Sequence, residues 1–141
     1  MSTAKVSRMR SLRAVALACL LVLLVAVPAS AAVVATGPGG FVAGFLPPVV
    51  VIEEGEGITY ANVDVAPHDF VADGHFIPKK AARKVKWCSG FDPGKCPLFW
   101  SPKIGAGETT EVEGLERLTS GDQYNFLCTV HPNMKGTLVV R

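Results

Sequence analysis

Three residues with metal-binding side chains recur at every third position near the end of the printed chain. Cys128, His131 and Met134 stand in the segment Cys-Thr-Val-His-Pro-Asn-Met, and this spacing lets one tight loop direct all three side chains to a single point. A thiolate, an imidazole and a weakly bound thioether are ligands of a blue copper centre, which requires one further histidine. The spacing therefore predicts a metal site that another part of the chain must complete.

The sequence offers two further histidines, His68 and His75. His68 follows Pro67 at the start of an expected strand, where a fixed backbone can direct the imidazole toward a neighbouring loop. His75 lies in the polar, glycine-containing segment Asp-Gly-His-Phe, which is typical of a solvated loop histidine. Taken alone, His68 would more often be structural than ligating. Beside the Cys/His/Met loop, we expect it to be the remaining ligand.

The first 31 residues have the composition of a Sec-type secretory signal peptide. Four cations and no acid precede an apolar run at residues 14–27, and residues 28–31 supply the small side chains that signal peptidase requires. We expect cleavage after Ala31, which leaves a domain at residues 32–141 in the periplasm or the extracellular space. The apolar run is short for a membrane-spanning helix, so no stable membrane anchor is expected after cleavage.

Cysteine usage supports a ligand role for Cys128. Outside the expected signal peptide the chain has Cys88, Cys96 and Cys128, and in an oxidising compartment this odd number indicates one disulfide and one thiol with another task. Cys88 and Cys96 enclose a Gly- and Pro-containing loop short enough for a disulfide to close, so we expect Cys128 to be free. The alternative is a structural zinc site formed by these cysteines and His131.

Charge and motifs exclude several other functions. Without the expected signal peptide, ten cations face the 12 acids, and no nucleic-acid-binding motif is present. An enzyme is not expected, because a multicopper oxidase or a copper nitrite reductase requires additional histidine pairs and His75 is the one spare histidine. No Ser/His/Asp set, phosphate-binding loop or paired-carboxylate signature offers another reaction.

The chain after residue 31 has the pattern of short strands separated by turns. No part of it shows a helical period of 3.6, which favours an all-β sandwich or barrel. We expect the strand at residues 41–46 to lie at an edge and the apolar strand at 49–52 to be buried. A strand or loose tail is expected at 33–35. Further strands are expected at residues 58–63, 109–112, 123–128 and 137–140, with another beginning at His68.

Residues 73–100 have no regular strand pattern and form an expected insert that the Cys88–Cys96 disulfide pins. The insert contains a cluster of basic residues. These cations are expected either to form a solvated face or to dock an acidic redox partner, because complementary charge speeds encounter. The cluster consists of Lys79, Lys80, Arg83, Lys84 and Lys86.

The chain resembles the cupredoxins, the blue copper family that includes plastocyanin, pseudoazurin and amicyanin. The resemblance is carried by Ala-Pro-His at residues 66–68 and by the Cys/His/Met loop at residues 128–134, and it extends over most of the chain after residue 31. Residues 56–62 resemble the strand before the first histidine ligand. Residues 105–112 resemble the turn and strand that follow the insert. The two residues between His131 and Met134 make the loop most similar to the short loop of amicyanin.

This resemblance implies a Greek-key β-sandwich that binds one copper ion in a type 1 site. His68, Cys128 and His131 would form the trigonal plane of ligands, with Met134 in the axial position. It also implies an exported carrier of single electrons, expected as a monomer that meets its redox partner proteins transiently. Copper sequestration or delivery outside the cytoplasm is an alternative that uses the same site. A zinc-binding or metal-free binding module is a further alternative.

One position next to the expected ligands departs from the family pattern. The residue after the first histidine is often Asn in cupredoxins, and here it is Asp69. We expect its carboxylate to accept hydrogen bonds from Thr129 and from backbone amides. A buried, ionised carboxylate would also favour Cu(II) and so lower the reduction potential. The alternative is an exposed Asp69 with no such role.

Apolar residues beside His131 are expected to form the rim through which electrons leave. Val130 and Pro132 flank this histidine in the sequence. Phe45 and Leu46 are further candidates for the same rim.

Overall fold

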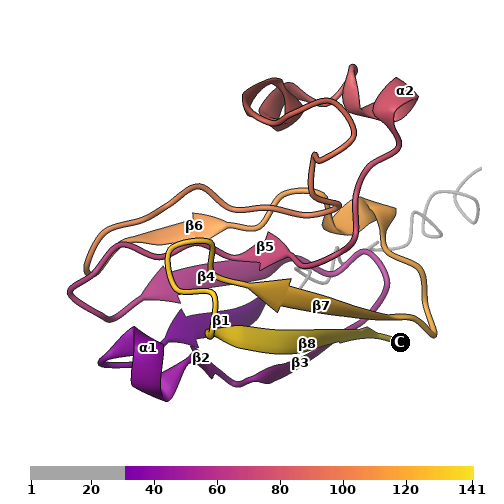
Figure 1. The fold of residues 1–141 in the computed structure, drawn as a ribbon. Helices are drawn as coiled ribbons and strands as arrows, with labels where there is room; N and C mark the ends of the chain where they lie inside the picture. Colours follow the sequence, from indigo (N-terminus) through magenta and orange to yellow (C-terminus); the bar gives the residue numbers. More distant parts are fainter. Residues whose placement is uncertain (1–30) are drawn as a thin grey trace, which may run out of the picture.

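The computed structural model describes residues 31–141, so the expected signal peptide lies outside the described residues except for Ala31. Two four-stranded sheets pack against each other in a sandwich (Figure 1), and the predicted all-β fold is confirmed. No helix among the described residues is long and apolar enough to cross a bilayer. The strands are β1 (Ala32–Thr36), β2 (Phe45–Leu46), β3 (Val49–Ile52), β4 (Ile58–Asn62), β5 (Val71–Ala72), β6 (Thr109–Glu111), β7 (Gln123–Leu127) and β8 (Lys135–Val140).

The chain passes repeatedly from one sheet to the other. The first sheet has the order β2-β1-β4-β6 and the second has the order β3-β8-β7-β5. β7 and β8 form an antiparallel pair joined by residues 128–134, and β5 pairs antiparallel with β7 through Val71 and Leu127. Because of this pairing, the residues just before β5 lie beside the residues just after β7. The topology therefore brings the His68 segment next to the Cys128 loop.

Aromatic side chains fill the space between the sheets. The rings of Phe70 and Phe126 stack with their centroids 4.2 Å apart, and Phe45 meets Phe126 edge-on at 4.9 Å. Tyr60 on β4 is fully buried and adds a fourth ring to this group. Burial of such large apolar surfaces is the main favourable contribution to folding. This core lies directly beneath the end of the sandwich that carries His68 and Cys128.

Two of the strand predictions are wrong in part. The expected edge strand at residues 41–46 is a single helical turn, α1 (Gly40–Ala43), followed by the two-residue strand β2. Gly39 and Gly44 bracket this turn with φ values of 66° and 67°, which glycine adopts without steric cost. The expected buried strand at 49–52 is the edge strand β3, in which Val49 and Val51 are 54% and 43% exposed. Its side chains alternate between the core and solvent, as they do in any edge strand with one covered face.

The strands predicted at residues 33–35, 58–63, 109–112, 123–128 and 137–140 are confirmed, with ends that shift by one or two residues. The strand expected to begin at His68 is shorter than predicted. His68 forms only an isolated bridge with Ile104, and the strand β5 begins at Val71.

The insert at residues 73–100 stands above the sandwich (Figure 1). It contains the short helix α2 (Lys79–Ala82) and a 3₁₀ turn at Lys86–Gly90, and a second 3₁₀ turn follows later at Leu115–Arg117. The predicted disulfide between Cys88 and Cys96 is present. Together with Ile77, these cysteines form a small apolar cluster separate from the main core. The disulfide thus pins a segment whose own core is small.

Candidate metal centre

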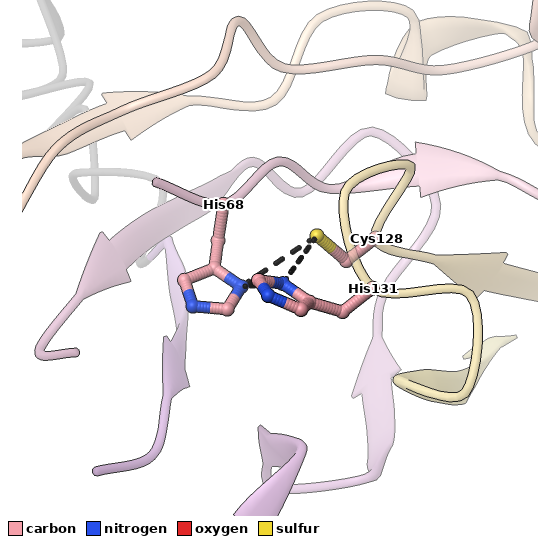
Figure 2. Close-up of side chains that lie close together, drawn as sticks. All are labelled: His68, Cys128 and His131. Atoms are coloured by element: carbon pink, nitrogen blue, oxygen red, sulfur yellow. Dashed lines mark hydrogen bonds between the residues drawn. The ribbon is translucent and has the colours of Figure 1, made fainter. Parts of the chain in front are cut away.

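The structure brings His68, Cys128 and His131 together at one end of the sandwich (Figure 2). Cys128 Sγ lies 3.6 Å from His68 Nδ1 and 3.9 Å from His131 Nδ1, and the two Nδ1 atoms are 3.1 Å apart. The metal-ligating atoms of these three side chains all lie within 4.8 Å of one another, and no second such group occurs within residues 31–141. Two sequence-distant segments therefore converge on one point, as predicted.

The spacing of these atoms fits a single metal ion. Bonds of about 2.0 Å to nitrogen and 2.3 Å to sulfur place the atoms of a trigonal plane about 3.5–3.7 Å apart. The three observed separations lie on either side of these values. One thiolate with two imidazoles is also the donor set of the trigonal plane in a blue copper site. The residues present therefore fit copper in both size and chemistry.

Backbone hydrogen bonds fix both ligand segments. The Cys128 amide donates to the Met134 carbonyl at 3.0 Å, and the Met134 amide donates to the His131 carbonyl at 2.8 Å, so the loop at residues 128–134 is closed on itself. His68 exchanges two backbone hydrogen bonds with Ile104, at 3.1 and 2.9 Å. The ligand side chains are therefore attached to backbone that is already held by its neighbours.

Burial distinguishes His131 from the other three residues of the predicted site. His68, Cys128 and Met134 are at most 1% exposed, whereas His131 is only partly buried. Burial raises the pKa of the Cys128 thiol above its ordinary value, and hydrogen bonds from backbone amides, including that of Asp69, only partly oppose this. The centre is therefore a water-poor site that reaches solvent on its His131 side.

Asp69 occupies the position predicted from the sequence. It is 2% exposed, and its Oδ1 accepts a hydrogen bond of 2.6 Å from the Thr129 amide. Its Oδ2 accepts a second hydrogen bond from the Thr129 hydroxyl. The alternative of an exposed Asp69 is therefore wrong. Its effect on copper remains a prediction.

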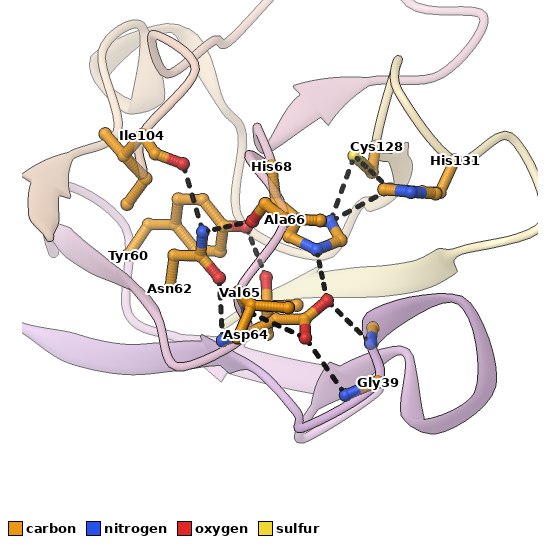
Figure 3. Close-up of polar contacts among 12 residues, drawn as sticks. Gly39, Tyr60, Asn62, Asp64, Val65, Ala66, His68, Ile104, Cys128 and His131 are labelled. Atoms are coloured by element: carbon orange, nitrogen blue, oxygen red, sulfur yellow. Dashed lines mark hydrogen bonds and ion pairs between the residues drawn. The ribbon is translucent and has the colours of Figure 1, made fainter. Parts of the chain in front are cut away.

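Asp64 was missed by the sequence analysis. Its Oδ2 lies 2.9 Å from His68 Nε2 (Figure 3). The hydrogen bond with His68, followed by those from the amides of Gly40, Val65 and Gly39, holds the pKa of Asp64 well below its ordinary range. The signal in the sequence was the spacing of four between an acid and the ligand histidine, but in a turn this spacing alone does not specify contact.

The other candidate residues lie away from the centre. His75 packs edge-on against Tyr124, with ring centroids 5.2 Å apart. The alternative zinc site is wrong, because Cys88 and Cys96 are bonded to each other. The basic residues of the insert, Lys79, Lys80, Arg83, Lys84 and Lys86, are all exposed.

The residues predicted to form the apolar rim differ in their exposure. Val130 and Pro132 are exposed beside His131, and Leu46 is 47% exposed. Phe45 is 1% exposed and points into the aromatic core, so its assignment to the rim is wrong. The alternation of strand β2 explains this, since Phe45 and Leu46 must face opposite sides.

Comparison with known proteins identifies the family. The model for copper binding proteins of the plastocyanin/azurin family matches residues 31–141. No curated protein sequence is significantly similar to the chain.

Among solved structures, a purple cupredoxin from Nitrosopumilus maritimus is 22% identical, with a TM-score of 0.54 over 78% of this chain and 99% of that one. A Cu(I) structure of an amicyanin variant is 21% identical, with a TM-score of 0.50 over 79% and 82%. A copper-containing nitrite reductase from Thermus scotoductus is 24% identical, with a TM-score of 0.52, but the match covers 79% of this chain and only 22% of that one. These likenesses show a shared fold. The chain belongs to the plastocyanin/azurin family of copper-binding proteins, and His68, Cys128, His131 and Met134 are positioned as its type 1 copper site.

Proposed function

We propose that this protein is an exported carrier that exchanges single electrons with partner proteins through one type 1 copper site. The observation that carries the proposal is the convergence of the buried Cys128 thiol with His68 and His131, next to the buried Met134. Copper in such a site alternates between Cu(II) and Cu(I), because thiolate and thioether stabilise the reduced ion while imidazoles retain the oxidised one. Cupredoxins mainly carry electrons, which agrees with this proposal.

The scaffold favours electron transfer because its ligand segments are held in place. The loop at residues 128–134 is closed by its own backbone hydrogen bonds and is continuous with β7 and β8. His68 is held by Ile104 on the neighbouring segment. A site that moves little when its charge changes suits electron transfer, because little rearrangement then opposes each step.

His131 is the expected point of electron exit. It is the partly exposed member of the site, and the exposed residues Val130 and Pro132 flank it. A partner that covers this rim would approach copper through one imidazole. α2, with part of the basic cluster, projects from the sandwich away from the β7–β8 loop (Figure 1). The basic cluster would therefore act by steering an acidic partner rather than by conducting electrons.

Export is supported by two observations. The Cys88–Cys96 disulfide is typical of an oxidising compartment. The family match begins at residue 31, beside the expected cleavage site. Cupredoxins are generally periplasmic or extracellular, and we propose that residues 32–141 form the exported, monomeric domain.

A visible spectrum tests the proposal. Purified protein loaded with Cu(II) should show an intense thiolate-to-copper band that a reductant bleaches and that Cys128→Ser abolishes. His75→Ala is the matched control and should keep the band, because His75 lies against Tyr124 and outside the site. A colourless protein would contradict the proposal. A blue protein that transfers its copper ion to an acceptor protein, instead of exchanging electrons with that protein, would indicate copper delivery.

A further inference from the structure

Asp64 contacts the edge of the His68 ring that faces away from the converging ligand atoms (Figure 3). His68 Nδ1 faces Cys128 and His131, while His68 Nε2 lies 2.9 Å from Asp64 Oδ2. Both ring nitrogens of this fully buried histidine therefore have partners.

The turn that carries Asp64 is fixed by Asn62 at the end of β4. The Asp64 amide donates to Asn62 Oδ1 at 3.0 Å. Asn62 Nδ2 donates in turn to the carbonyl oxygens of Ala66, at 2.7 Å, and Ile104, at 3.0 Å. Because Ile104 also pairs with His68, one network sets the positions of both the carboxylate and the imidazole.

The start of α1, with the preceding Gly39, holds the other side of the Asp64 carboxylate. The Gly40 amide donates to Oδ2 at 2.9 Å and the Gly39 amide donates to Oδ1 at 3.1 Å. Gly40 lies so close to the imidazole that a Cβ there would be 2.5 Å from His68 Cε1. The backbone therefore closes over His68 and Asp64 together, and water is kept from the hydrogen bond between them.

The donors around Asp64 indicate which ring nitrogen of His68 carries the proton in their hydrogen bond. Oδ1 accepts from the amides of Gly39 and Val65, and Oδ2 accepts from the Gly40 amide. An ionised carboxylate can only accept hydrogen bonds, so the contact with His68 requires the proton to lie on Nε2. His68 Nδ1 then carries a free lone pair, which is the form of the ring that can bind a metal.

We propose that Asp64 is a positioning residue of the copper site, which holds His68 as the Nε2–H tautomer and favours Cu(II) over Cu(I) through its negative charge. The inference rests on the proposed type 1 site. A carboxylate hydrogen-bonded to the far nitrogen makes the imidazole a stronger donor to the metal. A nearby negative charge also stabilises the ion with the higher positive charge. Both effects lower the reduction potential.

The test compares Asp64→Asn with Asp92→Asn in copper-loaded protein. Asparagine keeps the size of the side chain and removes its charge, and Asp92 is a carboxylate of the insert whose side chain is 79% exposed. Loss of a carboxylate that is hydrogen-bonded to a metal-ligating histidine weakens metal binding by about 10–100-fold. If Cu(II) is weakened tenfold more than Cu(I), the midpoint potential of Asp64→Asn rises by about 59 mV. Asp92→Asn should leave the potential unchanged.

A merely structural role for Asp64 predicts a different result. Asp64→Asn would then lose stability toward urea and keep both its potential and its visible spectrum, and this outcome would overturn the inference. An unsubstituted protein without a blue band would overturn the proposed function and this inference with it. A blue protein whose potential does not respond to Asp64→Asn overturns this inference alone.

A measurement on the unsubstituted protein covers the case in which Asp64→Asn does not fold. In the diamagnetic Cu(I) protein, ¹⁵N-resolved NMR reports which nitrogen of His68 carries the proton. We expect a slowly exchanging proton on Nε2, because the Gly39–Gly40 segment and Asp64 enclose it. A proton on Nδ1, or an Nε2 proton that exchanges as rapidly as that of a solvated imidazole, would overturn the inference.

Discussion

Asp69 accepts hydrogen bonds from both the backbone amide and the hydroxyl of Thr129. Asp69 follows His68 and Thr129 follows Cys128, so this buried carboxylate ties together the two segments that carry the ligands. The contact continues the pairing of β5 with β7 beyond the last ladder residues, Val71 and Leu127. It therefore places a negative charge close to Cys128 as well as fixing the geometry.

Asp69→Asn should raise the midpoint potential. The substitution removes a buried negative charge and keeps an oxygen that can accept from Thr129, so Cu(II) loses more stabilisation than Cu(I). A rise of roughly 60 mV would correspond to a tenfold change in the relative affinity for the two ions. Thr129→Val is the matched control, because it removes the hydroxyl donor and leaves the charge in place. An unchanged or lower midpoint potential in Asp69→Asn would contradict the prediction.

His68→Ala should abolish the blue band and weaken copper binding by 10-fold at the least, because the trigonal plane loses one imidazole. His75→Ala should bind copper as the unsubstituted protein does, since its ring contacts Tyr124 instead. Competition with a copper chelator, followed by the visible spectrum, measures both. The prediction fails if the His75 variant loses copper while the His68 variant keeps it.

The local part of the site was predictable and the long-range part was not. Cys128, His131 and Met134 lie in one short loop, so their spacing alone indicates a common target. The contacts of Asp64 involve Gly39 and Gly40, which are 25 and 24 residues away, and these depend on how the chain folds. A turn residue with an ordinary composition gives no sign of such partners.

The two errors in the strand assignment have similar causes. Whether Val49–Ile52 is buried depends on its position in the sheet, and among the strands of residues 31–141 it pairs with β8 at the sheet edge. Its apolar composition suits a strand but does not specify which faces are covered. At α1, the backbone freedom of Gly39 and Gly44 outweighs the strand tendency of the residues between them.

Gly136→Ala should destabilise the fold. A Cβ at Gly136 would lie 2.2 Å from Phe126 Cζ and 2.7 Å from the Pro48 carbonyl oxygen, so the central aromatic ring or the backbone must move. Overpacking of this kind costs about 1–3 kcal/mol in free energy of unfolding. Urea denaturation measures the loss. Gly90→Ala is the matched control, because a Cβ at that position meets open space, and equal stability of the two variants would contradict the prediction.

Copper uptake should release a proton from Cys128. Burial raises the pKa of this thiol above its ordinary value, so the apoprotein carries it as the thiol at neutral pH. Copper binds the thiolate, so loading displaces the thiol proton, and the apparent affinity should rise about tenfold per pH unit between about pH 7 and 8.5. The raised pKa also means that this thiol's contribution to apoprotein stability is complete below about pH 9 and is lost as the pH rises further. Chelator competition at several pH values, with proton release followed in weak buffer, measures the linkage. An affinity that does not change with pH would show that Cys128 is already a thiolate before copper arrives.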